Sequence, residues 1–296
     1  MTMLWGQWAV MSFGLIDAAV AGRYNTHDLA ALAIGTSIYI TIYVTLMAVL
    51  QVTLPLFSEQ IGRSDHNKLK QLLIQSCWVW FFLSVVGFFF LRSPEPLMDL
   101  TSVPNEPRQL AKEYLELMAW NFPTVLLFRL FASLAQSLAV PRLVSVIQVT
   151  ALALKLPLTI WLTFGGLGIQ GSGLTGCATS TLIVQLLMLT MAFWIWMNHE
   201  AFQVIRLKKI ELAIRWRTIR QILALGIPNG LTSAVEVSSF TMMGLFVARL
   251  GTVATASHQI AASLATFIFM IPMAFSVATS ARLSFWIGAN QIEKAK

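Results

Sequence analysis

The chain has 296 residues, of which 57% are hydrophobic and only 11% carry a charge, and its mean hydropathy is +0.72. A water-soluble domain of this size could not cover so much apolar surface, so the composition predicts a protein that crosses a membrane several times. The formal net charge of +7 would suit a nucleic-acid partner, but the placement of the basic residues along the chain indicates a membrane orientation instead.

Eight apolar stretches are long enough to cross a hydrocarbon core of about 30 Å, which takes about 20 helical residues. The first has no basic segment before it and no convincing cleavage site after it, so we expect a span rather than a cleaved signal peptide. The sequence therefore predicts an all-α, polytopic helical bundle. The predicted spans are 2–22, 30–58, 71–91, 110–138, 143–165, 173–197, 218–248 and 255–288.

Basic residues are distributed unequally between the two sides of the predicted bundle. Twelve follow even-numbered spans and five follow odd-numbered spans, so the even-numbered-span loops are predicted to face the cytoplasm. The basic stretch 206–220 is alternatively a patch for nucleic acid or a calmodulin-like partner, but its place between two spans favours a cytoplasmic loop without a nucleic-acid partner. The even-side residues are Arg63, Lys68, Lys70, Arg142, Arg206, Lys208, Lys209, Arg215, Arg217, Arg220, Lys294 and Lys296, and the odd-side residues are Arg23, Arg92, Arg108, Lys112 and Arg249.

Among the ionisable residues inside predicted spans, three are the most informative: Asp17 in the first span, Lys155 in the fifth and Glu236 in the seventh. A charge at the bilayer centre costs at least about 2.5–3.5 kcal/mol, so it normally faces the bundle interior or a watery path and has a partner. These residues are the main candidates for a functional site. The two cysteines, Cys77 and Cys177, lie far apart inside apolar runs and are predicted to be buried free thiols.

Asp17 and Lys155 are predicted to form a pair because they lie at similar depth. Lys155 follows the cytoplasmic Arg142 by 13 residues, about 19 Å along a helix, and Asp17 precedes the outer Arg23 by six residues, about 9 Å. In a core of about 30 Å, Asp17 then lies about 21 Å above the inner boundary. The added positive charge would weaken a Na⁺ site at Asp17. The alternatives are a helix-end carboxylate or structural ion pair at Asp17 and a Lys155 that snorkels to a surface.

The predicted seventh span has one polar face. Its members recur at spacings of three and four residues, which places them on the same side of a helix. A carboxylate beside an aromatic ring and a methionine suits a wall that binds cations of varied apolar shape, and the alternative is a polar seam between helices. The members are Asn229, Ser233, Glu236, Phe240 and Met243.

The other polar residues inside spans four and five have two possible interpretations. Arg129, Gln136 and Gln148 either line a cavity or hydrogen-bond between packed helices.

A weak internal repeat links the two ends of the chain. The segments IGRSDHNKLK (61–70) and IGANQIEKAK (287–296) share Ile, Gly, Lys and Lys at an offset of 226, and the same offset relates Arg23 to Arg249. Six intervening spans imply a parallel repeat of a six-helix unit about an axis along the membrane normal. We expect a six-helix lobe at 1–200, a basic loop at 201–217 and the first two helices of a second lobe at 218–296. About eight of twelve spans would then be present, with a C-terminal segment missing.

Several motifs have a family resemblance. FGLIDAAVAGR with DLAALAIGTSIY, then VTLPLFSEQIGRSD, resemble the first two helices of the multidrug and toxic compound extrusion (MATE) transporters. LALGIPNGLTSAVEVSSFTMMGLFVARLG and ASHQIAASLATFIFMIPMAFSVATSARLSFWIGA are similar to their seventh and eighth helices. The resemblance is to bacterial members, and it implies two six-helix lobes in the cytoplasmic (inner) membrane. It further implies export of small cationic or amphipathic compounds in exchange for H⁺ or Na⁺.

The resemblance also assigns roles to particular residues. Asp17 and Glu236 match the acidic residues of the family's first and seventh helices, which implies cation or proton coupling, with Na⁺ possible at either. Lys155 stands where the family more often has asparagine, and Thr159 replaces a second asparagine. The family's glutamate works with an acidic residue on a later helix that this chain lacks. We further expect Gln148, Thr159 and the residues Asn229, Ser233, Phe240 and Met243 of span seven to line the substrate path.

An integral membrane enzyme is the competing class of protein. Its metal or nucleophile motif is not visible, because the four histidines are scattered at span ends and no HxxxH, HExxH or CxxC pattern occurs. We therefore expect no enzyme, no cofactor and no resident metal. A flippase for lipid-linked substrates, and an inactive or partner-requiring fragment of a transporter, remain as alternatives.

Overall fold

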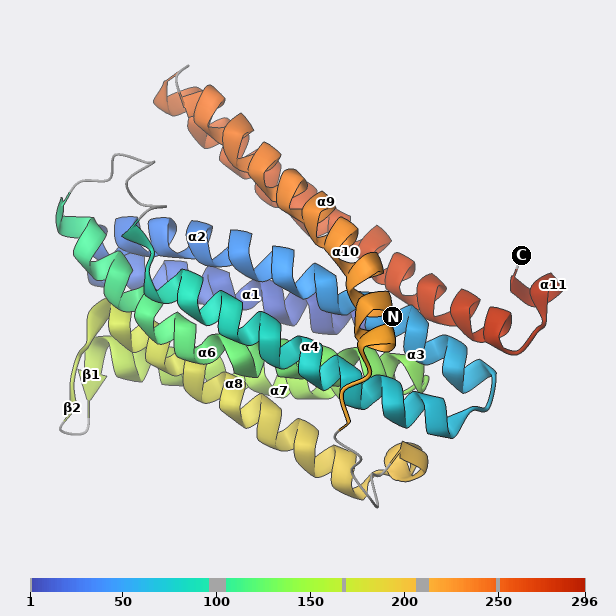
Figure 1. Cartoon of the computed structure of the whole chain (residues 1–296). Coiled ribbons are helices and arrows are strands. Elements are labelled where there is room, and N and C mark those ends of the chain that lie inside the picture. Colours follow the sequence, from blue (N-terminus) through green and yellow to red (C-terminus); the bar gives the residue numbers. More distant parts are fainter. Residues whose placement is uncertain (1, 96–104, 167–168, 206–212, 249–250, 296) are drawn as a thin grey trace.

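The computed structural model describes residues 2–95, 105–166, 169–205, 213–248 and 251–295, and it is almost entirely helical (Figure 1). Each predicted span is helical over nearly its whole length, so the all-α bundle that the sequence predicts is confirmed. The helices are α1 (Thr2–Tyr24), α2 (Thr26–Gln51), α3 (Thr53–Gly62), α4 (His66–Arg92), α6 (Asn105–Ser137), α7 (Pro141–Phe164), α8 (Gly173–Asn198), the 3₁₀ helix η1 (Glu200–Ile205), α9 (Trp216–Ala248), α10 (Thr252–Gly288) and α11 (Ile292–Ala295).

Two local features differ from the predicted elements. The predicted second span is divided into α2 and α3, because Pro55 has no N–H to donate to the carbonyl of Gln51 and the helical ladder is interrupted there. The loop after α7 contains a short antiparallel hairpin, β1 (Gly165–Gly166) and β2 (Ile169–Gln170), in which Gly165 is opposite Gln170. Both features are local and leave the order of the spans unchanged.

Seven helical segments in the described part of the chain are long and apolar enough to cross a membrane. They cover α1, α2 with α3, α4, α6, α7, α8 and most of α10. The seventh predicted span also forms a helix, α9, but this helix is not among the seven, and it carries Arg217, Arg220 and Glu236. Seven of the eight predicted spans therefore satisfy both length and composition, whereas α9 satisfies length alone.

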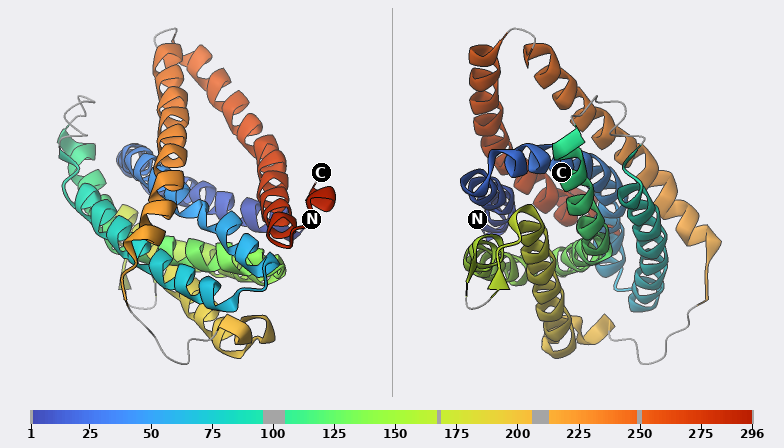
Figure 2. Two further views of the ribbon diagram at one scale, coloured as in Figure 1. Left: turned by 45° about the vertical axis from the view of Figure 1, so that its right-hand side comes forward. Right: turned by 90° about the vertical axis from the view of Figure 1, so that its left-hand side faces the viewer.

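The packed core lies in the bundle formed by α1 to α8, with contributions from η1 and the start of α9. Its largest fully buried side chains include Phe57, Phe122 and Phe202. Helix α9 packs mainly on α2, and α10 packs mainly on α3, while both extend away from the bundle at one end (Figure 2). Most large apolar side chains of α9 and α10 are exposed, so these two helices are an appendage to a well-packed unit.

Two contacts where α3 meets α10 are related to each other by the offset of 226 residues. A Cβ at Gly62 would collide with the carbonyl oxygen of Phe285, and a Cβ at Gly288 would collide with the carbonyl oxygen of Glu59. Ser64 and Asn290, also 226 apart, both adopt positive φ, at 55° and 57°. Such reciprocity is expected of two copies of one unit related by a twofold axis, which supports the predicted parallel repeat.

The prediction for the two cysteines was correct in one respect and wrong in another. Both thiols are free, and Cys177 is buried, but Cys77 is exposed. Helix α4 turns Cys77 to the outside of the bundle, where an apolar residue and a thiol are equally well tolerated beside lipid. An apolar run alone does not indicate which of its residues face neighbouring helices.

Candidate functional site

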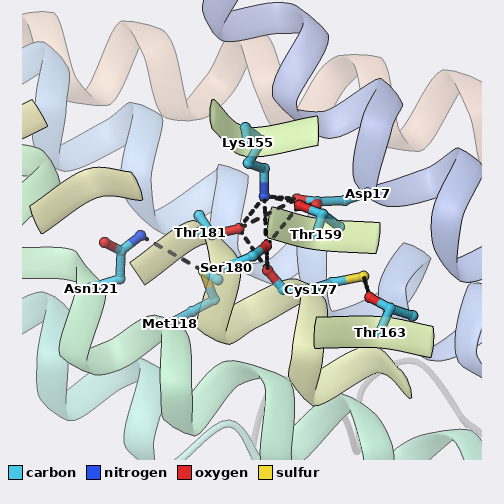
Figure 3. Close-up of polar contacts among 9 residues, drawn as sticks. All are labelled: Asp17, Met118, Asn121, Lys155, Thr159, Thr163, Cys177, Ser180 and Thr181. Atoms are coloured by element: carbon cyan, nitrogen blue, oxygen red, sulfur yellow. Dashed lines mark hydrogen bonds and ion pairs between the residues drawn. The ribbon is translucent and has the colours of Figure 1, made fainter. Parts of the chain in front are cut away.

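Asp17 of α1 and Lys155 of α7 form a buried ion pair, as their matched depth predicts. Lys155 Nζ donates to Asp17 Oδ1 at 2.7 Å and to Oδ2 at 2.9 Å (Figure 3). Lys155 is 0% exposed and Asp17 is 6% exposed. The alternative of a lysine that snorkels to a surface is therefore wrong, whereas a structural ion pair fits the contacts as well as a coupling site does, and the role of Asp17 stays a prediction.

Helix α8 completes the hydrogen bonding of this pair. Lys155 Nζ also donates to Thr181 Oγ1 at 2.5 Å and to Ser180 Oγ at 3.4 Å, and Thr181 Oγ1 lies 3.4 Å from Asp17 Oδ2. Thr159, one turn beyond Lys155 on α7, shares a 2.8 Å hydrogen bond with Ser180. The ammonium thus has a partner for each of its three protons, as a buried charge requires.

Small residues allow these helices to approach closely enough for such contacts. A Cβ at Gly176 of α8 would collide with the backbone of α7 at Leu162, and one at Gly6 of α1 would collide with Oε1 of Gln148 on α7. Close approach through small residues is the usual packing device of membrane helices. Gln148 therefore packs between α1 and α7, which is the second of the two alternatives given for it above.

The polar face of α9 is separate from the pair. Glu236 is exposed, Phe240 and Met243 are 53% and 49% exposed, and Ser233 is half-buried. Asn229 Nδ2 donates to the carbonyl oxygen of Ala48 on α2 at 2.7 Å, so this one residue acts as a seam between helices. Among the described residues, no hydrogen bond or ion pair connects Glu236 to Asp17 or Lys155.

Comparison with known proteins identifies the family. The MatE family model matches residues 3–161 and 228–296, which is more than half of the chain. The chain belongs to the MatE family. This membership, together with the seven apolar helices, makes it an integral membrane protein of a transporter family, not of an enzyme family.

Two curated relatives and one solved structure illustrate the similarity of this MatE chain. It is 34% identical over 281 residues to a probable multidrug resistance protein NorM of Aromatoleum aromaticum, covering 95% of the chain and 61% of the relative. It is 28% identical to the multidrug resistance protein MdtK of Yersinia pseudotuberculosis, covering 96% and 63%. A MOP superfamily transporter from Pyrococcus furiosus shares the fold, with a TM-score of 0.88, 16% identity and coverage of 99% and 64%. The chain therefore spans about 61–63% of the length of these curated relatives.

Sequence reasoning missed three polar residues around the site of this MatE protein. Ser180 and Thr181 lie in an apolar span and gave no charge signal, although two adjacent hydroxyls after Cys177 could have been noted. Asp28 is buried, and its Oδ2 accepts a hydrogen bond from the backbone N–H of Leu174 at 2.8 Å. Asp28 thereby satisfies an N–H group in the first turn of α8 and connects α2 to that helix.

The remaining polar candidates lie elsewhere. Arg129 and Gln136 line a small cavity between α6 and α10. Within the described part of the chain, no three His, Cys, Asp or Glu side chains are grouped closely enough to hold a metal ion.

Proposed function

We propose that this chain forms part of a secondary active efflux antiporter, which exports cationic or amphipathic compounds in exchange for H⁺ by alternating access. The family and the multidrug resistance names of its relatives support the efflux activity. The observation that carries the choice of ion is the Asp17–Lys155 pair.

The pair is suited to proton coupling. Lys155 places a fixed ammonium group against both carboxylate oxygens of Asp17, in the position that a bound cation would take. A Na⁺ ion would have to displace this ammonium from a buried site, whereas a proton only has to reach one carboxylate oxygen. Protonation of Asp17 removes the charge that holds Lys155 and leaves it with the hydroxyls of Ser180 and Thr181. Proton binding therefore changes the contacts among α1, α7 and α8.

The other parts of the chain take the roles that the sequence suggests. Residues 1–200 form the first lobe, 201–217 form a cytoplasmic loop and 218–296 begin the second lobe, in the bacterial inner membrane with the even-numbered-span loops in the cytoplasm. Glu236 is a second coupling carboxylate that attracts cations, and its exposure on α9 leaves it accessible to them. The proposed substrate-lining residues are Asn229, Ser233, Phe240, Met243, Thr159 and Gln148, and the buried Thr159 and Gln148 are the least accessible of them.

The test is transport of a fluorescent organic cation, under imposed gradients, in proteoliposomes that contain this chain together with the remaining helices of a longer relative. An outward proton gradient, with an acidic lumen, should drive accumulation of the cation in the lumen against its own gradient, and a sodium gradient without a pH gradient should not. The variant Lys155→Asn, which restores a neutral amide beside Asp17, should gain a response to sodium. Uptake that follows sodium alone in the unaltered protein would refute the proton assignment.

The alternative is a chain that needs a partner. Glu236 and its neighbours on α9 are exposed, and polar groups exposed to lipid lack the partners that a bundle interior provides. We expect residues 1–296 to insert and fold their first lobe but not to transport unless the remaining helices of a longer relative are co-expressed. Gradient-dependent efflux by the chain alone, shown to be monomeric, would contradict this expectation.

A further inference from the structure

A small polar cavity lies where the first lobe meets α10, away from the Asp17–Lys155 pair. Its volume is about 40 Å³, and its walls come from α1, α2, α3, α6 and α10. This is room for about three water molecules, since each needs about 10–15 Å³ of such space. The polar residues that line it are Gln7, Gln51, Arg129, Ser133 and Gln136.

Arg129 brings an unbalanced positive charge to this cavity. It is half-buried on α6, eight residues before the helix ends at Ser137, or about 12 Å along the axis. Its Nε donates to the hydroxyl of Tyr43 at 2.8 Å, and within the described chain no carboxylate pairs with its guanidinium. A charge inside a membrane bundle normally has a counter-ion, so Arg129 has an open position for an anionic group.

The two buried acidic residues of the described chain are already engaged. Asp17 is neutralised by Lys155, and the Oδ2 atom of Asp28 accepts from the first turn of α8. Within the described interior of the first lobe, no carboxylate therefore balances the positive charge of Arg129.

The other polar side chains of the cavity are also unused. Those of Gln7, Gln51, Ser133 and Gln136 make no hydrogen bond to other described residues. Three amides, a hydroxyl and a guanidinium supply N–H and O–H donors around one space. This set of donors is complementary to a carboxylate, which accepts several hydrogen bonds and pairs with arginine in a bidentate geometry.

We propose that this cavity is a binding subsite for the carboxylate group of amphipathic organic acids and zwitterions. The proposal rests on the proposed efflux function and concerns the amphipathic part of its substrate class; a compound with only cationic groups would be repelled by Arg129 and would bind elsewhere. The cavity has room for the carboxylate alone, so the apolar part extends out past Met47 and Met273, whose flexible side chains adapt to varied shapes. Since Met273 belongs to α10, an occupied subsite would connect the first lobe to α10.

Equilibrium binding to the purified 296-residue chain tests this assignment without requiring transport. The probes are 1-pyrenebutyrate, its uncharged amide and a pyrenylmethyl ammonium salt, which share one fluorophore and differ in charge. The unaltered chain should bind the carboxylate about tenfold or more tightly than the amide, and the ammonium probe least tightly. Arg129→Gln should remove the preference for the carboxylate, Arg129→Lys should keep part of it, and the exposed control Arg142→Gln should leave it unchanged.

A second variant tests the same cavity by adding a negative charge to it instead of removing the positive charge. Gln136→Glu adds a carboxylate to the cavity, where it would pair with Arg129, so it should weaken binding of the carboxylate probe about tenfold and leave the amide probe unaffected. If Arg129→Gln does not fold, Gln136→Glu and Arg129→Lys decide the matter. Equal affinity of the unaltered chain for carboxylate and amide, or a preference that survives both Arg129→Gln and Gln136→Glu, would overturn the proposal. A failed transport assay with a retained carboxylate preference would reject the antiporter function but not the subsite.

Discussion

Removing one partner of the Asp17–Lys155 pair should destabilise the protein far more than removing both. The Nζ–Oδ distances of 2.7 and 2.9 Å correspond to an attraction of about 6 kcal/mol at an effective dielectric constant of about 20. Much of this is offset by the desolvation of two buried ions. Asp17→Asn or Lys155→Met alone should therefore cost about 3–5 kcal/mol, because each leaves one uncompensated buried charge.

The double variant should recover most of this loss. When Asp17→Asn and Lys155→Met are combined, only neutral groups remain at the two positions, and the cost should fall to about 0–2 kcal/mol. The coupling energy between the two sites is then several kcal/mol, well above the about 0.5 kcal/mol expected of independent sites. The measurement is equilibrium unfolding in mixed micelles of increasing denaturing detergent, followed by tryptophan fluorescence.

A surface pair supplies the matched control. Lys112 and Glu95 have the same 2.7 Å Nζ–O distance, but their side chains are 36% and 54% exposed. The corresponding variants Lys112→Met and Glu95→Gln should combine additively, since water and salt screen an exposed pair. Additive effects at Asp17 and Lys155 would refute the reasoning, because they would mean that burial does not strengthen the interaction between the two charges.

Two further predictions concern the ends of α3 and α10 and the start of α4. Gly62→Ala and Gly288→Ala should each cost about 1–3 kcal/mol in the same unfolding assay, because each Cβ meets backbone of the opposite helix. Gly14→Ala, where the Cβ has open space, should be neutral or stabilising by up to about 1 kcal/mol, and equal effects at all three positions would contradict this packing. Asp65 begins α4, and the backbone N–H of Lys68 donates to it at 3.0 Å, which holds the pKa of Asp65 below its ordinary value. The contribution of Asp65 to stability is therefore present above its unfolded-state pKa and is lost as pH falls through its lower folded-state pKa. Asp65→Ala should lower the free energy of unfolding at neutral pH and have no effect in acid. A difference between the two proteins that stays constant across this pH range would count against the assignment.

The matched level of two charged groups along the bundle was predictable from the sequence. A helix rises about 1.5 Å per residue, so residue counts from the ends of two spans place their side chains along one shared axis. This was sufficient to predict that Asp17 and Lys155 lie at one level, and the structure pairs them. The repeat was predictable for a similar reason, because matched positions such as Gly62 and Gly288 need no knowledge of packing to be recognised.

Angular position around each helix was decided only by the tertiary structure. An apolar residue is acceptable both in the core and beside lipid, so hydropathy does not show which face of a membrane helix is buried. For this reason the sequence placed Cys77 inside, although it faces out, and did not identify Ser180 and Thr181 as partners of Lys155. The donors around Arg129 come from helices far apart in the chain, and only their packing brings them to one cavity. Sequence and helical rise thus determined the matched level of Asp17 and Lys155, whereas contacts between helices determined which other groups meet them.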